Sequence, residues 1–260
     1  MKTKRRQPGF TLMEEAIVVA VISLLVVLGI PAVRVLIHSF ETEGGTKSMI
    51  SAALASARAI AAKEQRYAGI RFQHTYYKDD PANSPLKAPQ YMIFIVYDFD
   101  NTKLADGFRA VEGLQPIKLP DSAGVMEVVN SNGEIDDTPN GELLIDKTTF
   151  SIIFSPSGKL IIHPVQTRNR NGESSGTASK DDIFNTWDSI TDSTAPHGMF
   201  LQDYGTTSSD YPRKESSRNS FIIYDRTIFE KLNPNSRYGD YLKDLQVIYI
   251  NPYTGTMINR

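Results

Sequence analysis

The apolar positions of this chain fall into one long N-terminal run and, later, many short runs separated by polar turns. The run Ala16–Val33 has 18 residues and no charge. At ~1.5 Å per residue, a helix of this length nearly crosses a hydrocarbon layer ~30 Å thick. By the positive-inside rule, the basic residues ahead of it place the N-terminus in the cytoplasm and the remaining chain beyond the membrane: Lys2, Lys4, Arg5 and Arg6.

A second helical segment follows the membrane-spanning part, which we expect at about 14–37. Ser48–Ala62 contains seven alanines, and alanine has the highest helix propensity. We therefore predict a helix over 10–66 that ends against the globular part of the chain. The small alanine side chains allow close approach of a partner. We expect the segment to pack on its own sheet, and contact with other chains stays open.

From Tyr67 onward the pattern changes to short strands and turns. The sequence predicts strands at the ranges Gln90–Asp98, Val125–Val129, Thr148–Phe154, Lys159–Val165 and Phe221–Asp225, then a helix, Arg226–Leu232, and a closing hairpin of Val247–Ile250 with Thr256–Asn259. Pro156 and Gly158 stand where a type I turn favours them. The fold class expected is α+β: a long N-terminal helix followed by an antiparallel, sandwich-like head over 67–260.

One stretch of the head, 166–219, is unusually long and polar for a connection within a compact domain. Inside it, Asp182–Ile190 places Ile183, Phe184, Trp187 and Ile190 at helical spacing. Trp187 is the only tryptophan in the chain. Two interpretations stay open, a short element that folds back on the head and a contact element for a partner.

Two carboxylates, Glu14 and Glu15, stand between the basic leader and the apolar run. Carboxylates drawn into a bilayer cost a few kcal/mol each, so a simple signal anchor has no use for them. The run is also not followed by the small-x-small cleavage site of a secretory signal.

Gly9-Phe10-Thr11-Leu12-Met13-Glu14-Glu15, behind a basic leader and ahead of an apolar helix, resembles the prepilin cleavage and methylation motif. The resemblance implies that a prepilin peptidase removes the leader 1–9, cuts between Gly9 and Phe10, and methylates Phe10. It also implies that Glu14 and Pro31 occupy the positions where type IV pilins carry a glutamate and a proline. Met13 and Pro8 are small departures from the family pattern.

The chemistry of the two positions agrees with this resemblance. Cleavage would create an ammonium group at Phe10, and a carboxylate inside a membrane needs a partner of that kind. In a filament, Glu14 could pair with the Phe10 ammonium of a neighbouring subunit. Pro31 removes one backbone hydrogen bond and kinks or loosens the helix, which family pilins use in packing.

The head has a narrower similarity. SARAIAAKEQ, then YMIFIVYD and FSPSGKL, is similar to the H-type minor pseudopilins of type II secretion and to related minor pilins. The resemblance implies a structural subunit, not an enzyme, in a bacterial inner membrane with its head in the periplasm or outside. Its implied partners are other pilin or pseudopilin subunits, the prepilin peptidase and an inner-membrane assembly platform. The alternative is a membrane-anchored enzyme or binding protein that uses the same leader.

Composition excludes several other functions. The chain has 28 basic and 30 acidic residues, and without the four basic residues of the leader the balance is 24 against 30, or −6. Such a body does not attract phosphate backbones, so we expect no nucleic-acid partner. Without cysteine there is no disulfide and no thiolate metal site.

Other candidate chemistry is sparse, and we expect no cofactor. Gly172-Glu173-Ser174-Ser175-Gly176 matches the G-x-S-x-G pattern, but its flanks are polar where a nucleophile elbow needs a strand and a helix. The four histidines show no metal-ligand spacing. Asp98, Asp100 and Asp106, with Asn101, gather at one turn and are possible calcium ligands, although aspartate is also an ordinary turn residue.

Overall fold

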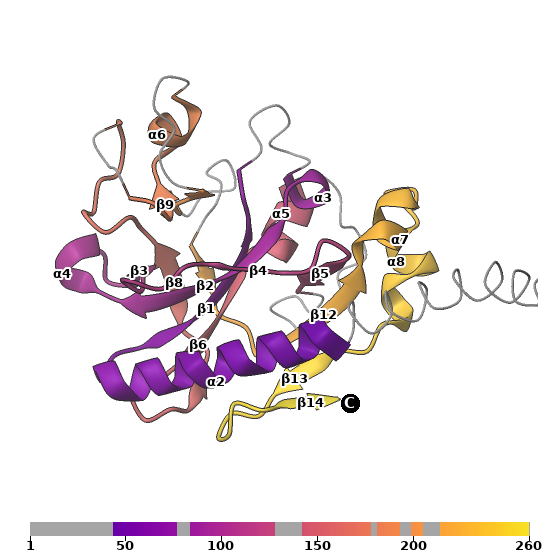
Figure 1. Cartoon of the computed structure of the whole chain (residues 1–260), viewed down its shortest axis with the longest axis horizontal. Coiled ribbons are helices and arrows are strands. Elements are labelled where there is room, and N and C mark those ends of the chain that lie inside the picture. The colour runs from indigo at the N-terminus through magenta and orange to yellow at the C-terminus, as the bar shows by residue number, and fades with distance from the viewer. Residues whose placement is uncertain are drawn as a thin grey trace, which may run out of the picture.

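The computed structural model describes residues 44–76, 84–127, 142–177, 181–192, 199–204 and 214–259. Over these residues the fold is α+β, as the sequence predicts. Helix α2 (Thr46–Glu64) packs on a curled, mixed sheet of eight strands, and smaller sheets of four and two strands complete the head (Figure 1).

The large sheet follows the order β11-β8-β3-β2-β1-β6-β7, and β4 also pairs with β2. Its central strands β1 and β2 pair antiparallel, with Ile70 opposite Phe94. The strand bounds are β1 (Ala68–His74), β2 (Gln90–Tyr97), β3 (Gly107–Ala110), β4 (Ile117–Lys118), β6 (Phe150–Phe154), β7 (Leu160–Ile161), β8 (Pro164–Thr167) and β11 (Glu215–Ser216).

The expectation of an antiparallel head is wrong at two pairings. In the large sheet β3 and β8 run parallel, with Gly107 opposite Gln166, and the separate two-stranded sheet is also parallel. β8 reaches β3 by a crossover rather than a tight turn, so no hairpin fixes its direction. The predicted strand Lys159–Val165 is accordingly divided. β7 pairs with β6 and β8 pairs with β3, and the chain changes neighbours at Ile162 and His163.

The four-stranded sheet has the order β14-β13-β12-β5 and is antiparallel. Its strands are β5 (Ala123–Met126), β12 (Ser220–Asp225), β13 (Ile248–Ile250) and β14 (Met257–Asn259). Asp225 caps α7 (Arg226–Lys231) by accepting from the N–H groups of Thr227 and Ile228. The predicted strand 221–225, the helix after it and the closing hairpin are therefore confirmed.

The α2 helix forms one side of the main core. Its buried positions follow helical spacing, and Ile50, Leu54 and Ala57 are wholly buried. They pack on the side chains of β1, β2 and β6 and on the four-stranded sheet. The expectation that this alanine-rich helix packs on its own sheet is confirmed. It ends at Gln65, which adopts the left-handed conformation.

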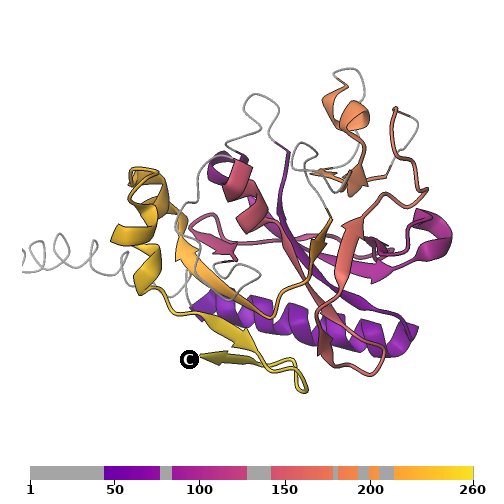
Figure 2. The same ribbon diagram turned by 180° about the vertical axis from the view of Figure 1, so that it is seen from behind.

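On the other face of the large sheet, described residues between 181 and 204, within the segment 166–219, pack against the strands. A second cluster joins Ile93 and Ile95 of β2 with Ile183, Phe184 and Phe200. β9 (Phe184–Asn185) and β10 (Phe200–Leu201) pair in parallel here, next to α6 (Trp187–Thr191). Both views place α2 and α6 on opposite sides of the large sheet (Figure 1 and Figure 2).

Short helices complete the fold: α3 (Ser84–Lys87), α4 (Phe99–Thr102), α5 (Glu142–Thr148), α8 (Arg237–Asp240) and the 3₁₀ turn η3 (Leu242–Asp244). Two further strands have a boundary that differs from the sequence expectation by more than one residue. Thr148 ends α5, so β6 begins at Phe150. β5 covers 123–126, and Val128 and Val129 lie outside the described residues.

Candidate functional site

The predicted processing and assembly residues, Gly9, Phe10, Glu14 and Pro31, lie outside the described residues, and so does Ala16–Val33. Among the helices that the structure describes, none is long and apolar enough to cross a membrane. The leader 1–9 and the start of the helix 10–66 therefore stay predictions. The sites that can be placed belong to the head.

Asp98, the first possible calcium ligand, caps α4. One carboxylate oxygen accepts from the backbone N–H of Asn101 at 3.1 Å, and the other from Asn101 Nδ2 at 2.8 Å and Arg109 Nε at 2.5 Å. Burial acts to raise the pKa of Asp98, but the hydrogen bonds from Arg109 and Asn101 outweigh it and hold that pKa below its ordinary value. These oxygens are therefore already occupied by donors.

Asp100 and Asp106 do not join Asp98 in a metal site. Asp106 forms an ion pair with Lys214 of the segment 166–219, while Asp100 is exposed on α4. Within the described parts of the chain, no three His, Cys, Asp or Glu residues are grouped so as to hold a metal ion. Asp98 instead caps α4 and pairs with Arg109, and Asp106 pairs with Lys214.

The segment Asp182–Ile190 is not the continuous helix that its spacing suggests. Ile183 and Phe184 are buried before the helix begins, and α6 starts only at Trp187. Thr186 caps α6 by accepting from the N–H of Ser189. Ile190 is buried as well, so this element folds back on the head.

Trp187 itself is different, because its side chain is 43% exposed. Its ring meets Tyr76 edge to face, with 5.3 Å between centroids. Its backbone N–H donates to the hydroxyl of Tyr204. The backbone of Trp187 is thus fixed to the head while much of the indole remains open to solvent.

A buried ion pair joins the segment 166–219 to the sheet. Arg71 of β1 donates to Asp203 Oδ1 at 2.6 Å and to Gln73 Oε1 at 2.7 Å, and both charged side chains are almost wholly buried. Asp203 Oδ2 accepts from the N–H of Thr167 at 2.7 Å. Burial raises the pKa of Asp203, and Arg71 and Thr167 oppose that shift. We call this arrangement the Arg71–Asp203 latch.

Neighbouring amides extend the latch. Gln73 Nε2 donates to the carbonyl of Leu201 at 2.8 Å, and Gln202 Oε1 accepts from the N–H of Asn169 at 3.2 Å. Gln202 Nε2 also donates to the carbonyl of Glu173 at 2.9 Å. On this face of the sheet, buried polar groups therefore add to the apolar cluster, whereas α2 packs on its face mainly through apolar side chains.

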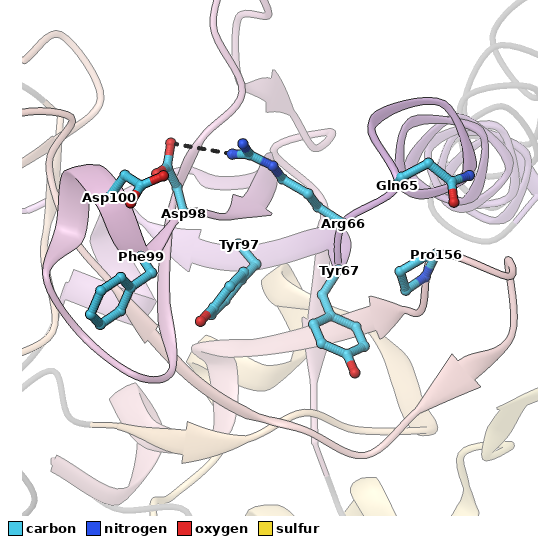
Figure 3. Close-up of a pocket in the computed structure, with 8 residues that line it drawn as sticks. All are labelled: Gln65, Arg66, Tyr67, Tyr97, Asp98, Phe99, Asp100 and Pro156. Atoms are coloured by element: carbon cyan, nitrogen blue, oxygen red, sulfur yellow. Dashed lines mark ion pairs between the residues drawn. The ribbon is translucent and has the colours of Figure 1, made fainter.

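A recess of about 340 Å³ opens at the C-terminal end of α2. Figure 3 shows the rings of Phe99, Tyr97, Tyr67 and Pro156 in a row, with Arg66 and Asp98 above them. Arg66 lies 3.8 Å from Asp98. We call this feature the aromatic recess; Gln65 and Asp100 complete its lining.

The remaining sequence candidates are placed without a shared site. Residues 172–176 form an exposed bend in a loop, not the strand–turn–helix of a nucleophile elbow. His74 is buried and contacts the carbonyl of Ala88 through Nδ1 at 2.9 Å. His163 packs its ring on Tyr67. His38 and His197 lie outside the described residues.

Sequence reasoning did not single out the latch or the aromatic recess. In the sequence, polar and apolar side chains alternate within Ala68–His74. This pattern indicates which side chains share a face of the sheet, but it does not indicate that Arg71 is buried against Asp203. The recess is formed by the residues at the ends of α2 and β2, and a turn brings Pro156 to the same place.

Comparisons with known proteins give no relative. No family model matches the chain, and neither a curated protein nor a solved structure matches it.

Proposed function

We propose that this chain is a type IV pilin-like subunit, a minor pseudopilin or pilin of a type II secretion or pilus-like filament. The observation that carries the proposal is the run from Gly9 to Glu15 between four basic residues and an apolar segment. In this proposal a prepilin peptidase removes residues 1–9. The apolar helix then anchors the subunit in the bacterial inner membrane, with its head in the periplasm or outside.

The arrangement of the head supports this function. α2 crosses the strands of the large sheet and packs on β1, β2 and β6 (Figure 1). An N-terminal helix laid against a β-rich head is what a pilin-like subunit needs, because one end of the helix carries the head and the other assembles. Before Lys63, the exposed positions of α2 are serine or alanine, including Ala52, Ala55 and Ala59, so other helices can approach this part closely.

Assembly would depend on Glu14. After cleavage, its carboxylate would meet the Phe10 ammonium of an adjacent subunit, and each charge would be compensated in a low-dielectric environment. Pro31 would supply the local break in the helix that packing into a filament requires. The partners are other pilin-like subunits and an inner-membrane assembly platform.

Processing is tested by mass spectrometry of the mature N-terminus. We expect chains that begin with methylated Phe10, and a Gly9→Leu variant that stays at precursor length in the membrane. Phe10→Leu is the matched control, because it alters the other side of the cut and should still be processed. Mature chains that begin beyond the apolar segment would overturn the proposal.

Assembly is tested by co-purification of partner subunits after membrane extraction. Glu14→Ala should be cleaved normally but recovered with fewer partners, because an unpaired buried charge costs about 3–5 kcal/mol. Glu15→Ala is the matched control and should behave nearly as the wild type. Equal recovery of the wild type and Glu14→Ala would remove the pairing mechanism while leaving the processing result intact.

A further inference from the structure

The aromatic recess is built on a rigid turn. The backbone of α4 is held by Asp98, which accepts the N–H of Asn101, and by Thr102, whose N–H donates to the Asp98 carbonyl at 3.1 Å. A loop of the segment 166–219 supports the turn from behind. Gly172 has a φ of +73°, and a Cβ there would lie 2.3 Å from the carbonyl oxygen of Asn101.

The rings along the recess are supported in the same way. Tyr67 and Tyr97 meet edge to face with 6.1 Å between centroids, and the ring of His163 packs at a tilt against Tyr67, with 4.7 Å between centroids. Phe108 lies behind Tyr97 at 5.8 Å. Phe99, at the end of the row, is the first residue of α4 and is 52% exposed. A ligand would therefore meet apolar ring surface that needs no rearrangement, which lowers the entropic cost of binding.

Positively and negatively charged side chains border these rings. The side chain of Arg66 is 47% exposed and lies 3.8 Å from an Asp98 carboxylate that Arg109 already compensates. Asp100 is exposed at the same edge as Arg66, and Figure 3 shows the hydroxyl groups of Tyr67 and Tyr97 on the opposite side of the rings. The positive charges of Arg66 and Arg109 balance the negative charges of Asp98 and Asp100.

We propose that the aromatic recess binds a neutral saccharide, whose pyranose rings pack against separate rings of the row Tyr67, Tyr97 and Phe99. The planes of Tyr67 and Tyr97 differ by 84°, so one sugar ring packs on one of them and not on both. The C–H groups on a pyranose face are apolar and weakly positive, so they pack on the negative face of an aromatic ring. Its hydroxyl groups both donate and accept, which suits the guanidinium of Arg66, the carboxylate of Asp100 and the tyrosine hydroxyl groups.

Size and charge both favour this class of ligand. About 340 Å³ lies near the lower end of the ~300–1,000 Å³ typical of small-ligand sites, and suits a disaccharide-sized group. Arg109 is not part of the lining but pairs with Asp98, and with its charge included the site has no net charge to attract a free anion or cation. An extended proline-rich peptide also docks on aromatic rows, but it would leave the mixed polar border with few hydroxyl partners. The inference concerns the head alone and does not depend on the filament function.

Saturation-transfer NMR on the full chain tests the proposal, with cellotetraose, maltotetraose and chitotetraose as separate probes and a proline decamer as the competing ligand. The detergent is a polyoxyethylene ether, because an alkyl maltoside carries a sugar that would occupy the recess. We expect transfer to the pyranose C–H protons of at least one oligosaccharide, and none to the proline decamer.

Two variants locate the binding. Phe99→Ala and Arg66→Ala should each weaken the affinity by about tenfold, the effect of one lost contact of ordinary strength. Both side chains are largely exposed, so far-UV circular dichroism should show an unchanged fold. Tyr253→Ala removes an aromatic ring of similar exposure, 69%, in the turn between β13 and β14, and should change nothing.

Three outcomes overturn the proposal. They are no transfer to any of the three oligosaccharides at millimolar concentration, transfer to the proline decamer alone, and saccharide transfer that Phe99→Ala leaves unchanged. The last of these would place a saccharide elsewhere on the chain. None of the three bears on cleavage at Gly9.

Discussion

The two faces of the large sheet are covered by different chemistry. On one face, α2 contributes Ile50, Leu54 and Ala57 to an apolar core with the strands. On the other, the segment 166–219 combines a smaller apolar cluster with the Arg71–Asp203 latch. The difference teaches that this protein attaches its long polar segment by a buried ion pair in addition to apolar contact, and its N-terminal helix mainly by burial of apolar surface.

The two kinds of attachment respond differently to change. Apolar packing tolerates substitutions that keep volume and loses stability in proportion to the volume removed. A buried ion pair is sensitive to the loss of either partner, because the remaining charge has no solvent and no counter-charge. The latch should therefore be the more fragile of the two attachments.

The largest effect is expected from Asp203→Ala. It leaves the buried guanidinium of Arg71 and the N–H of Thr167 without their acceptor, at a cost of about 3–5 kcal/mol in the free energy of unfolding. Urea unfolding of the full chain in detergent measures this cost, and limited proteolysis should show earlier cleavage within 166–219.

The matched control for that variant is the double substitution Arg71→Met with Asp203→Leu. Replacing both members of a buried ion pair by apolar residues is often neutral, so most of the lost stability should return. If Asp203→Ala costs less than about 1 kcal/mol, the latch does not hold the segment.

A somewhat smaller effect is expected on the helix face. Leu54→Ala removes a fully buried side chain from between α2 and the strands, at a cost of about 3 kcal/mol. Here the whole head should lose stability in one cooperative transition, with no selective cleavage within 166–219. Ala55→Ser, one position along on the exposed side of α2, should change the free energy of unfolding by less than about 0.5 kcal/mol.

The elements on the α2 side of the large sheet are also the ones that the sequence predicts well. The alanine-rich run predicts α2 because propensity and apolar spacing are local properties. The same holds for β2, for β12 followed by α7, and for the hairpin of β13 and β14. Each is formed by contiguous residues whose turn or cap is visible nearby, such as Asp225 before α7.

The opposite face depends on contacts that no local pattern encodes. Arg71 and Asp203 are 132 residues apart, and an arginine within a strand gives no sign of a buried partner. Ile183, Phe184 and Ile190 have helical spacing, but Phe184 pairs with Phe200 in a parallel ladder instead. Tertiary pairing overrides the local period there, as it does for β8 beside β3.

A pH dependence of about 2 kcal/mol should arise at His74, on the last residue of β1. Burial lowers the pKa of His74 to about 3, while the nearby carbonyl of Ala88 opposes that shift and the charge of Arg226 adds to it. Because the folded pKa lies below the ordinary value of 6.5, the neutral ring stabilises the fold above pH 6.5. That stability is lost as the pH falls toward 3, by about 1.4 kcal/mol per unit, or about 2 kcal/mol at pH 5.

Unfolding at pH 7.5 and pH 5.0 tests this for the wild type and for His74→Gln, which keeps an amide donor near Ala88. The test compares the change in the free energy of unfolding between the two pH values in the wild type with the same change in His74→Gln. Burial raises the pKa of Glu215 to about 8, and repulsion from Asp146 and Glu127 adds to the shift. Protonation of Glu215 therefore adds stability as the pH falls, opposite to the effect of His74. Because Glu215 is present in both proteins, its contribution cancels in the comparison. Equal slopes in the wild type and the variant would assign the pH dependence to other groups.

The smallest effect on stability is expected at Trp187, on the outer side of the same segment that the latch holds from within. Its side chain is 43% exposed and its main contact is the edge-to-face ring of Tyr76. Trp187→Ala should therefore change the free energy of unfolding by about 1 kcal/mol or less. Its backbone N–H still donates to Tyr204, so α6 keeps its place.

In the proposed filament, an exposed tryptophan on a fixed backbone is a suitable interface anchor. Co-purification of partner subunits should then fall with Trp187→Ala and largely survive with Trp187→Phe. Tyr253→Ala, another exposed aromatic, is the control. A loss of more than about 2 kcal/mol would instead make Trp187 part of the packing that holds 166–219 on the sheet, and recovery equal to that of the wild type would remove it from the partner surface.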